Sequence, residues 1–197
     1  MTTYEHIVWT NTWFEDQGET DLRRALLVGD SITNAARPFV KECVGETLRV
    51  DAVTTSRALD DPGYLTELDY VLGLNAYDVI HFNNGLHGFH LSAEDYETLY
   101  DGVVAHVLEK CPGTKLVLAL TTPVSLGEHR ELLDAAVNGA VLARNAAVLR
   151  IAGKYGLETD DLYSLVVGIP EIRTADSYHY LEPGSRRIAG QIASYLR

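Results

Sequence analysis

Several features are scarce in this sequence, and each scarcity excludes a class of protein. Its 197 residues include only two cysteines, Cys43 and Cys111, with no C-x-x-C spacing, so neither a disulfide framework nor a cysteine-based metal site is expected. No apolar run approaches the roughly 18 residues of a membrane span, and Met1 to Asp16 lacks the basic start and apolar stretch of an export signal. We therefore expect a cytoplasmic protein with no membrane partner.

Basic side chains are also in the minority. The chain has 16 lysines and arginines against 28 acidic residues, which gives a formal net charge of -12. Such a charge repels phosphate backbones and anionic membrane surfaces, so nucleic acid is not expected as a partner. The glycine patterns of phosphate-binding loops are missing from the first strand-to-helix turn, and we expect no cofactor.

The organisation of the chain is uniform, with no internal repeat, linker or low-complexity segment. We expect residues 1–197 to form a single domain, with residues 1–23 as an N-terminal extension packed on it. Apolar runs predict five strands, at residues 25–29, 48–53, 79–83, 115–120 and 157–159. Helical periodicity predicts helices at residues 33–43, 64–74, 92–109, 128–155 and 183–196.

The alternation of these elements predicts an α/β fold. We expect a three-layer α/β/α sandwich around a five-stranded parallel sheet, with a flavodoxin-like arrangement. In such a sheet the loops that follow the strands all open onto one edge, and ligands bind there. Candidate functional residues are therefore sought in these loops.

The first of these loops contains Gly29, Asp30 and Ser31, directly after an apolar run. This position would place the Ser31 hydroxyl at the carboxyl edge of a buried strand. A glycine turn followed by an aspartate or serine is also ordinary helix-cap chemistry. The tripeptide alone therefore does not identify a nucleophile.

The last loop contains Asp176 and His179, three positions apart. That spacing lets the carboxylate hold the Nδ1–H of the ring, which leaves Nε2 free to act as a general base. A serine hydroxyl needs such a base to attack an ester, so Ser31, His179 and Asp176 would supply nucleophile, base and orienting carboxylate. An exposed loop histidine beside an acidic residue is the alternative interpretation of the pair.

The loop after the third predicted strand is rich in hydrogen-bond donors. It includes Asn83, Asn84 and His87, separated by Gly85 and Leu86. Acyl transfer needs donors aimed at the oxyanion that forms on the carbonyl oxygen. Plain turn formation explains the two asparagines equally well.

Taken together, these loops resemble the SGNH hydrolases, also called GDSL esterases. Gly29-Asp30-Ser31-Ile32 resembles the first block of the family, which carries the nucleophile, and Asp176-x-x-His179 resembles the last block. Gly85-Leu86-His87-Gly88 falls where the family usually has G-x-N-D, whose asparagine donates to the oxyanion. The resemblance spans residue 24 to the C-terminus and implies the SGNH fold and a Ser-His-Asp esterase.

Two departures from the family pattern concern the oxyanion donors. His87 stands at the position of the family asparagine, so the donor is either its imidazole N–H or the neighbouring Asn84. The stretch after the second predicted strand has no glycine, which leaves a backbone N–H of Ser56 or Arg57 as a candidate. A solvated surface charge is the alternative role of Arg57.

The resemblance also implies a substrate. Residues 115–124 are similar to those of a subset of the family associated with acetylated carbohydrates. The candidate substrate contacts are Asp30, Asn83, Thr122 and Tyr178. We predict a serine esterase that removes an acetyl or other short acyl group from a small molecule, with carbohydrates as the candidate class.

Three other functions remain as alternatives. One is a lysophospholipase or thioesterase of the same family. Another is a non-catalytic, flavodoxin-like binding module. The third is a metal enzyme that uses His81, His87 and His90, although their spacing matches no zinc pattern.

Overall fold

A six-stranded sheet forms the centre of the protein in the computed structural model, which describes residues 7–18 and 21–197. The strands lie in the order β1-β3-β2-β4-β5-β8, and all except β1 are parallel. Their bounds are β1 Thr10–Trp13, β2 Arg24–Gly29, β3 Arg49–Thr55, β4 Val79–Phe82, β5 Lys115–Ala119 and β8 Glu158–Asp160. Numbered along the chain, the parallel strands follow the order 2-1-3-4-5 of flavodoxin-like folds.

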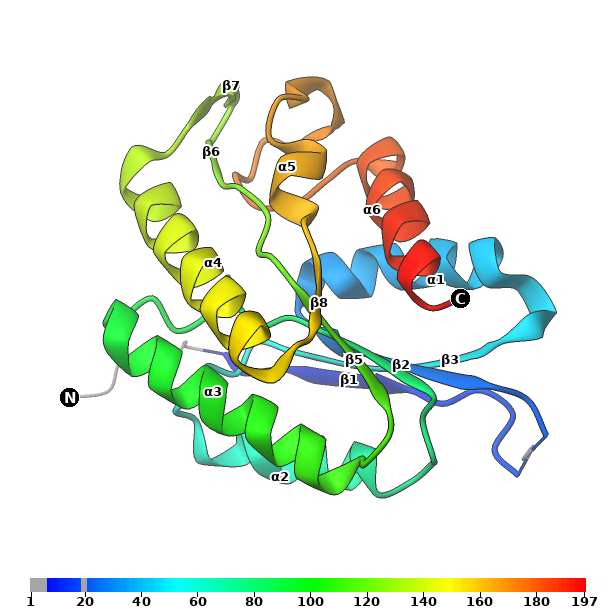
Figure 1. The fold of residues 1–197 in the computed structure, drawn as a ribbon. Coiled ribbons are helices and arrows are strands. Elements are labelled where there is room, and N and C mark those ends of the chain that lie inside the picture. Colours follow the sequence, from blue (N-terminus) through cyan, green and yellow to red (C-terminus); the bar gives the residue numbers. More distant parts are fainter. Residues whose placement is uncertain (1–6, 19–20) are drawn as a thin grey trace.

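Helices cover both faces of this sheet (Figure 1). They are α1 Ser31–Val44, α2 Pro62–Leu72, α3 Ala93–Lys110, α4 Ala135–Tyr155, α5 Leu162–Val166 and α6 Glu182–Tyr195, with short 3-10 turns at Gly45–Thr47 and Pro170–Ile172. Helices α1, α5 and α6 pack on one face, and α2, α3 and α4 pack on the other. The predicted three-layer sandwich with its five parallel strands is confirmed.

The central strand β2 explains why an uninterrupted apolar run predicts a strand of this sheet. Ala25 and Leu27 belong to the core under α1 and α6, whereas Leu26 and Val28 belong to the core under α2, α3 and α4. Successive side chains of a strand point to opposite faces, so a strand covered on both sides must be apolar throughout. The uninterrupted apolar run before Gly29 is the result.

The N-terminal segment contributes a strand that the sequence analysis did not predict. β1 pairs antiparallel with β3, with Thr10 opposite Thr55 and Trp13 opposite Ala52. Trp13 packs against the core under α1 and α6, whereas Phe14 packs against the core on the opposite face. The described part of the expected extension is therefore an edge of the sheet, and residues 1–6 and 19–20 lie outside the described residues.

The predicted helix at residues 128–155 begins too early. A hairpin of β6 Ser125–Leu126 and β7 His129–Leu133 precedes it, with Gly127 at φ 57° in the turn. Helix α4 starts only after Asp134, whose carboxylate accepts hydrogen bonds from the N–H groups of Ala136 and Val137. This cap fixes the start of the helix because it satisfies N–H groups that have no partner within the helix.

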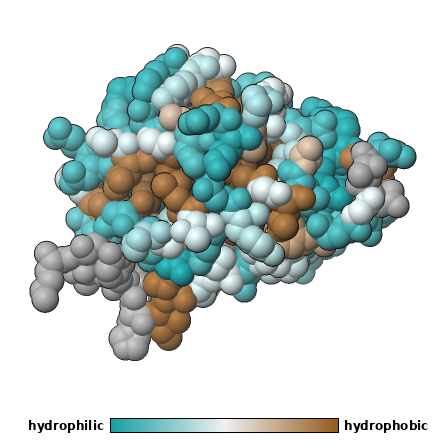
Figure 2. Space-filling view, turned by 90° about the horizontal axis from the view of Figure 1, so that it is seen from below, coloured by the Kyte–Doolittle hydropathy of each residue, from teal (hydrophilic) through white to brown (hydrophobic). Residues whose placement is uncertain are grey.

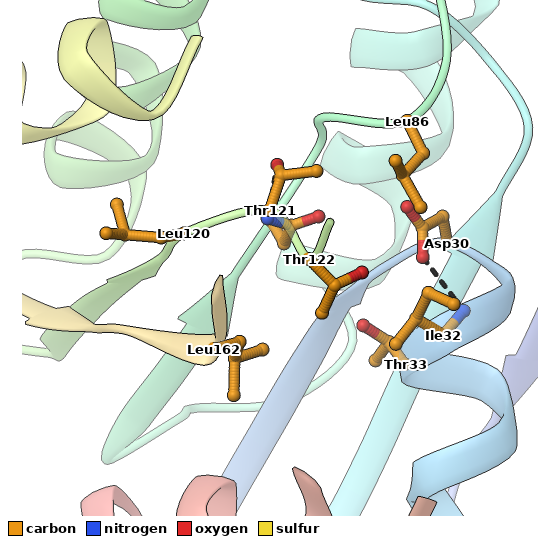
Figure 3. A pocket seen from close by; sticks show the side chains of 9 residues that line it. Asp30, Ile32, Thr33, Leu86, Leu120, Thr121, Thr122 and Leu162 are labelled. Atoms are coloured by element: carbon orange, nitrogen blue, oxygen red, sulfur yellow. Dashed lines mark hydrogen bonds between the residues drawn. The ribbon is translucent and has the colours of Figure 1, made fainter. Parts of the chain in front are cut away.

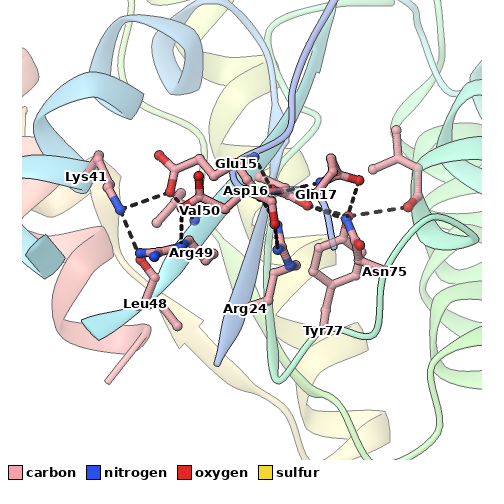
Figure 4. A network of polar contacts seen from close by, with 12 residues as sticks. Glu15, Asp16, Gln17, Arg24, Lys41, Leu48, Arg49, Val50, Asn75 and Tyr77 are labelled. Carbon is pink, nitrogen blue, oxygen red and sulfur yellow. Dashed lines mark hydrogen bonds and ion pairs between the residues drawn. The ribbon is translucent and has the colours of Figure 1, made fainter. Parts of the chain in front are cut away.

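A polar network ties the N-terminal segment to the amino edge of the sheet (Figure 4). Arg24 donates to Asp51 at 2.8 Å and to the carbonyl oxygen of Glu15 at 2.7 Å. The other oxygen of Asp51 accepts from Asn75 and Tyr77, so the buried carboxylate has a donor on each side. This network lies at the end of the sheet opposite the loops that follow β2, β3 and β4.

The face of the molecule with α2 and α3 is mostly hydrophilic, with apolar patches between the polar side chains (Figure 2). Exposed large side chains on α2 include Leu65 and Tyr70. Within the part of the chain that the structure describes, no helix has the length and apolar character needed to cross a bilayer.

Candidate active site

Ser31 lies where strand β2 passes into helix α1. Asp30 is the N-cap of this helix, and its carboxylate accepts the N–H of Ile32 at 2.9 Å. Gly29 is required at the turn because a Cβ there would lie 2.0 Å from the Oγ1 of Thr33. The tripeptide can therefore serve both as a helix cap and as the site of a nucleophile, since Asp30 caps the helix and Ser31 is its first residue.

The loop before α6 brings His179 to this serine. The Nε2 atom of His179 lies 2.8 Å from the Oγ of Ser31, and its Nδ1 atom lies 2.6 Å from the Oδ2 of Asp176. The three side chains therefore form one hydrogen-bonded chain at the carboxyl edge of the sheet. This is the arrangement predicted from the two ends of the sequence.

Asp176 is held by several donors besides the histidine ring. Its Oδ1 accepts the backbone N–H groups of His179 at 2.9 Å and Tyr178 at 3.1 Å, and the hydroxyl of Thr174 at 2.7 Å. Partial burial pushes the pKa of Asp176 upward, but the hydrogen bonds outweigh this effect and hold the pKa well below its ordinary value. The carboxylate stays ionised and can orient the ring.

Two features of this loop were not found from the sequence. The hydroxyl of Thr174 supports Asp176, and Ser177 adopts φ 81°, which is rare for a residue other than glycine. Ser177 is bonded to the β6-β7 hairpin, since its carbonyl oxygen accepts from Ser125 and its Oγ accepts from Gly127. The only available sequence signal was the polar character of the segment from Thr174 to Ser177.

The candidate donors after β3 already have partners. The N–H of Ser56 donates to the carbonyl oxygen of Trp9, and the N–H of Arg57 donates to the Oγ1 of Thr55. The guanidinium of Arg57 pairs with Asp61 and Glu67, each at 2.8 Å. The unpredicted N-terminal strand explains this bond, which lies directly beyond the pairing of β1 with β3.

The loops after β3 and β4 meet over the end of β2. The Nδ2 of Asn84 donates to the carbonyl oxygen of Arg57 at 3.0 Å. Because β2 lies between β3 and β4 in the sheet, this bond bridges the strand that leads to Ser31. His87 follows in the same loop, and its ring makes an edge contact with Trp9 at 6.5 Å between centroids.

Three of the four predicted substrate contacts are buried. Asn83 donates to the carbonyl oxygen of Ala119 and to the Oγ1 of Thr121. Asp30 and Thr122 line a small, largely enclosed cavity (Figure 3). Tyr178 differs because it is 38% exposed and directly precedes His179. Of the four, only Tyr178 has open surface that a substrate can reach.

The histidines of the metal alternative have separate partners. His81 is fully buried and bonded to Asp160, while His90 is bonded to Asp60 near the surface. His87 instead contacts Trp9. Among residues 7–18 and 21–197, no group of three or more His, Cys, Asp or Glu side chains is placed to hold a metal ion.

The sequence matches no protein-family model and no curated protein. The fold, however, is similar to solved structures. A protein of Parabacteroides merdae described as a GDSL-like lipase has a TM-score of 0.72 at 17% identity, covering 90% of this chain and 99% of that one. An acetyl xylan esterase has a TM-score of 0.72 at 18% identity, covering 88% of this chain and 100% of that one.

A carbohydrate acetylesterase from Sinorhizobium meliloti has a TM-score of 0.71 at 14% identity, covering 87% of this chain and 97% of that one. At these identities the similarity concerns the fold. The chain has the fold of the SGNH, or GDSL-type, hydrolases, as its sequence motifs predicted.

Proposed function

We propose that this protein is a serine esterase that hydrolyses short acyl esters, with acetyl esters as its preferred substrates. The observation that carries the proposal is the hydrogen-bonded chain from Ser31 through His179 to Asp176. A hydroxyl, an imidazole and a carboxylate in that order form the set that activates serine for acyl transfer.

The first half of the reaction acylates the enzyme. The Oγ of Ser31 attacks the ester carbonyl while the Nε2 of His179 accepts its proton. Asp176 holds Nδ1–H and stabilises the imidazolium that forms. When the tetrahedral intermediate collapses, His179 gives the proton to the departing alcohol, and the acyl group remains on Ser31.

The second half regenerates the serine. A water molecule attacks the acyl group as His179 takes one of its protons. The ring then returns this proton to Ser31, and the carboxylic acid leaves. Since only a neutral ring can accept the first proton, we expect kcat/KM to fall in acid.

The negative charge on the intermediate needs donors. The N–H of Ser31 belongs to the first turn of α1, where N–H groups lack partners within the helix and the helix dipole favours an anion. The loop after β4 supplies the second set of candidates, His87 and Asn84. We favour His87, because it stands at the position of the oxyanion asparagine in the family pattern.

The substrate class is also a proposal. Two proteins with the same fold are described as an acetyl xylan esterase and a carbohydrate acetylesterase, which supports an acetylated carbohydrate. A longer acyl chain is the second candidate, because Leu126 is 47% exposed on the hairpin that is bonded to Ser177. No cofactor takes part in the proposed steps.

An ester-length series tests these proposals. Rates with p-nitrophenyl acetate, butyrate and octanoate, and acetate release from acetylated xylose, would be compared with the Ser31→Ala variant as the blank. We expect the highest kcat/KM with acetate and no turnover by the variant. A preference for octanoate would favour the lysophospholipase or thioesterase alternative, and equal turnover by Ser31→Ala would contradict the esterase proposal. Substrate binding without turnover by either protein would favour the binding module.

A further inference from the structure

Arg144 of helix α4 reaches the loop that contains His87 and binds it at three points. Its Nη1 donates to the carbonyl oxygens of Gly85 at 2.9 Å and His87 at 2.8 Å, and its Nη2 donates to that of Gly88 at 2.6 Å. The side chain is 3% exposed. A single guanidinium therefore fixes most of residues 85–88.

Two aromatic rings enclose the same guanidinium. Its central carbon lies 4.5 Å from the ring centroid of Phe89 and 4.6 Å from that of Tyr96. Tyr96 also donates its hydroxyl to the carbonyl oxygen of Asn84 at 2.6 Å, so the ring that supports Arg144 holds the preceding part of the loop. Burial lowers the pKa of Arg144, and among the described residues no carboxylate forms an ion pair with it. Its charge acts on the loop carbonyls.

The loop packs closely against its neighbours at both of its glycines. A Cβ at Gly85 would lie 1.6 Å from the Oγ1 of Thr121, and one at Gly88, where φ is 71°, would lie 2.7 Å from the Cβ of Ala58. In a trans peptide the N–H points away from the carbonyl oxygen of the preceding residue. Because the carbonyl oxygens of three residues in this loop point toward Arg144, the N–H groups of the residues that follow them point away from the guanidinium. These are the N–H groups of Leu86, Gly88 and Phe89.

We propose that Arg144 is a positioning residue, which holds the loop 85–88 so that its donors are preorganised for the oxyanion. This inference rests on the proposed esterase function. Donors that are already in place lower the energy of the transition state more than that of the bound ester. Loss of the guanidinium should therefore reduce kcat while KM changes little.

The test compares two arginines of one helix. Arg144→Gln is measured beside Arg150→Gln, whose side chain is 60% exposed and pairs with Glu97 away from the loop. We expect kcat to fall on the order of 10- to 100-fold in Arg144→Gln, as for a small misplacement of a reacting group, with KM within about twofold. Arg150→Gln should match the wild type.

A boronic acid provides the readout that a general loss of stability would not reproduce. Phenylboronic acid forms a tetrahedral adduct with an active serine, so its Ki should rise by the same factor as kcat/KM falls. Arg144→Lys keeps the charge but not the planar fork, and we expect an intermediate loss. If Arg144→Gln does not fold, the kcat and Ki of Arg144→Lys test the proposal instead.

The outcomes separate this inference from the proposed function. Wild-type kcat and Ki in Arg144→Gln, or in Arg144→Lys if only that variant folds, would overturn the role of Arg144 and leave the esterase intact. A fall in kcat without a rise in Ki would overturn it as well. Absence of turnover and of boronate binding in the wild type would instead remove the proposed function.

Discussion

The Nε2 atom of His179 lies 2.8 Å from the Oγ of Ser31, although the two residues are 148 positions apart in the chain. Ser31 begins helix α1, and His179 lies in the loop just before helix α6. Both helices belong to the layer that covers one face of the sheet (Figure 1). The geometry of the proposed reaction therefore depends on how the first and last helices pack.

Thr174 provides a first prediction, because its hydroxyl donates to Asp176. Removing this bond in Thr174→Val raises the pKa of Asp176, which the loop hydrogen bonds now hold below its ordinary value. A carboxyl group with a depressed pKa is ionised over most of the acid range. It becomes protonated only as the pH falls through that pKa. Because Asp176 loses one of the bonds that hold it in place, we expect Thr174→Val to orient the His179 ring less firmly and to lower kcat/KM at pH values where the enzyme is fully active.

The matched control for this prediction is Thr174→Ser, which keeps the hydroxyl and should keep the wild-type kcat/KM. The measurement is kcat/KM for all three proteins at pH values where the wild type is fully active. Equal kcat/KM for Thr174→Val and the wild type at these pH values would show that the hydroxyl does not support Asp176.

Gly29→Ala tests the turn that places Ser31. The added methyl group would meet the Oγ1 of Thr33 at 2.0 Å, so α1 or Thr33 must move. We expect the free energy of unfolding to fall by about 1–3 kcal/mol, as in other overpacked sites, and kcat to fall with it. Gly139→Ala is the control, because nothing lies within 4 Å of a Cβ at that helical position. Alanine there should leave stability unchanged or raise it, and equal effects of both substitutions would contradict the account.

The strand-to-helix turn at Ser31 could be predicted because its signals are local. Gly29 ends an apolar run, Asp30 caps the following helix, and the three-residue spacing of Asp176 and His179 allows their contact. The parallel strands were recognisable for the same reason, since burial on both faces requires continuous apolar residues.

Other features depend on contacts between distant segments and leave little trace in the sequence. Thr10–Trp13 lacks an apolar run and becomes a strand because the edge of β3 is open to it. That pairing uses the N–H of Ser56, which family resemblance alone could not reveal. The position of Arg144 between Phe89 and Tyr96 likewise requires three separate segments to come together.

Buried tyrosines predict a loss of stability in alkali. Burial raises the pKa of Tyr180 to about 12 and that of Tyr100 well above its ordinary value. In the unfolded chain these phenols ionise near pH 10, so their contribution is complete below that pH and is lost as the pH rises toward the folded values. We expect the urea midpoint to fall as the pH rises from about 10 toward 12.

Tyr100→Phe should reduce this alkaline loss, because it removes a phenol that only the unfolded chain ionises readily. Tyr70→Phe is the control, since Tyr70 is 61% exposed. An identical pH dependence of the urea midpoint in Tyr100→Phe and Tyr70→Phe would contradict the argument.

The buried pair of Arg24 and Asp51 gives a prediction at the edge of the sheet opposite the candidate active site. Arg24→Met leaves the fully buried Asp51 without its cation. Breaking such a pair costs about 3–5 kcal/mol because the remaining charge is uncompensated. Denaturant unfolding measures this, with Arg150→Met as the control in a solvent-exposed pair, where we expect little change. A similar small effect of both substitutions would show that Asp51 is adequately held by Asn75 and Tyr77.

The most direct test of the central claim is the mass of the intact protein after reaction with a fluorophosphonate, followed by peptide mapping of the adduct. The account predicts one adduct, located on Ser31, that is absent from Ser31→Ala and forms far more slowly in His179→Gln. A wild-type protein that stays unlabelled, or one labelled at another residue, would contradict the claim that Ser31 is a nucleophile activated by His179.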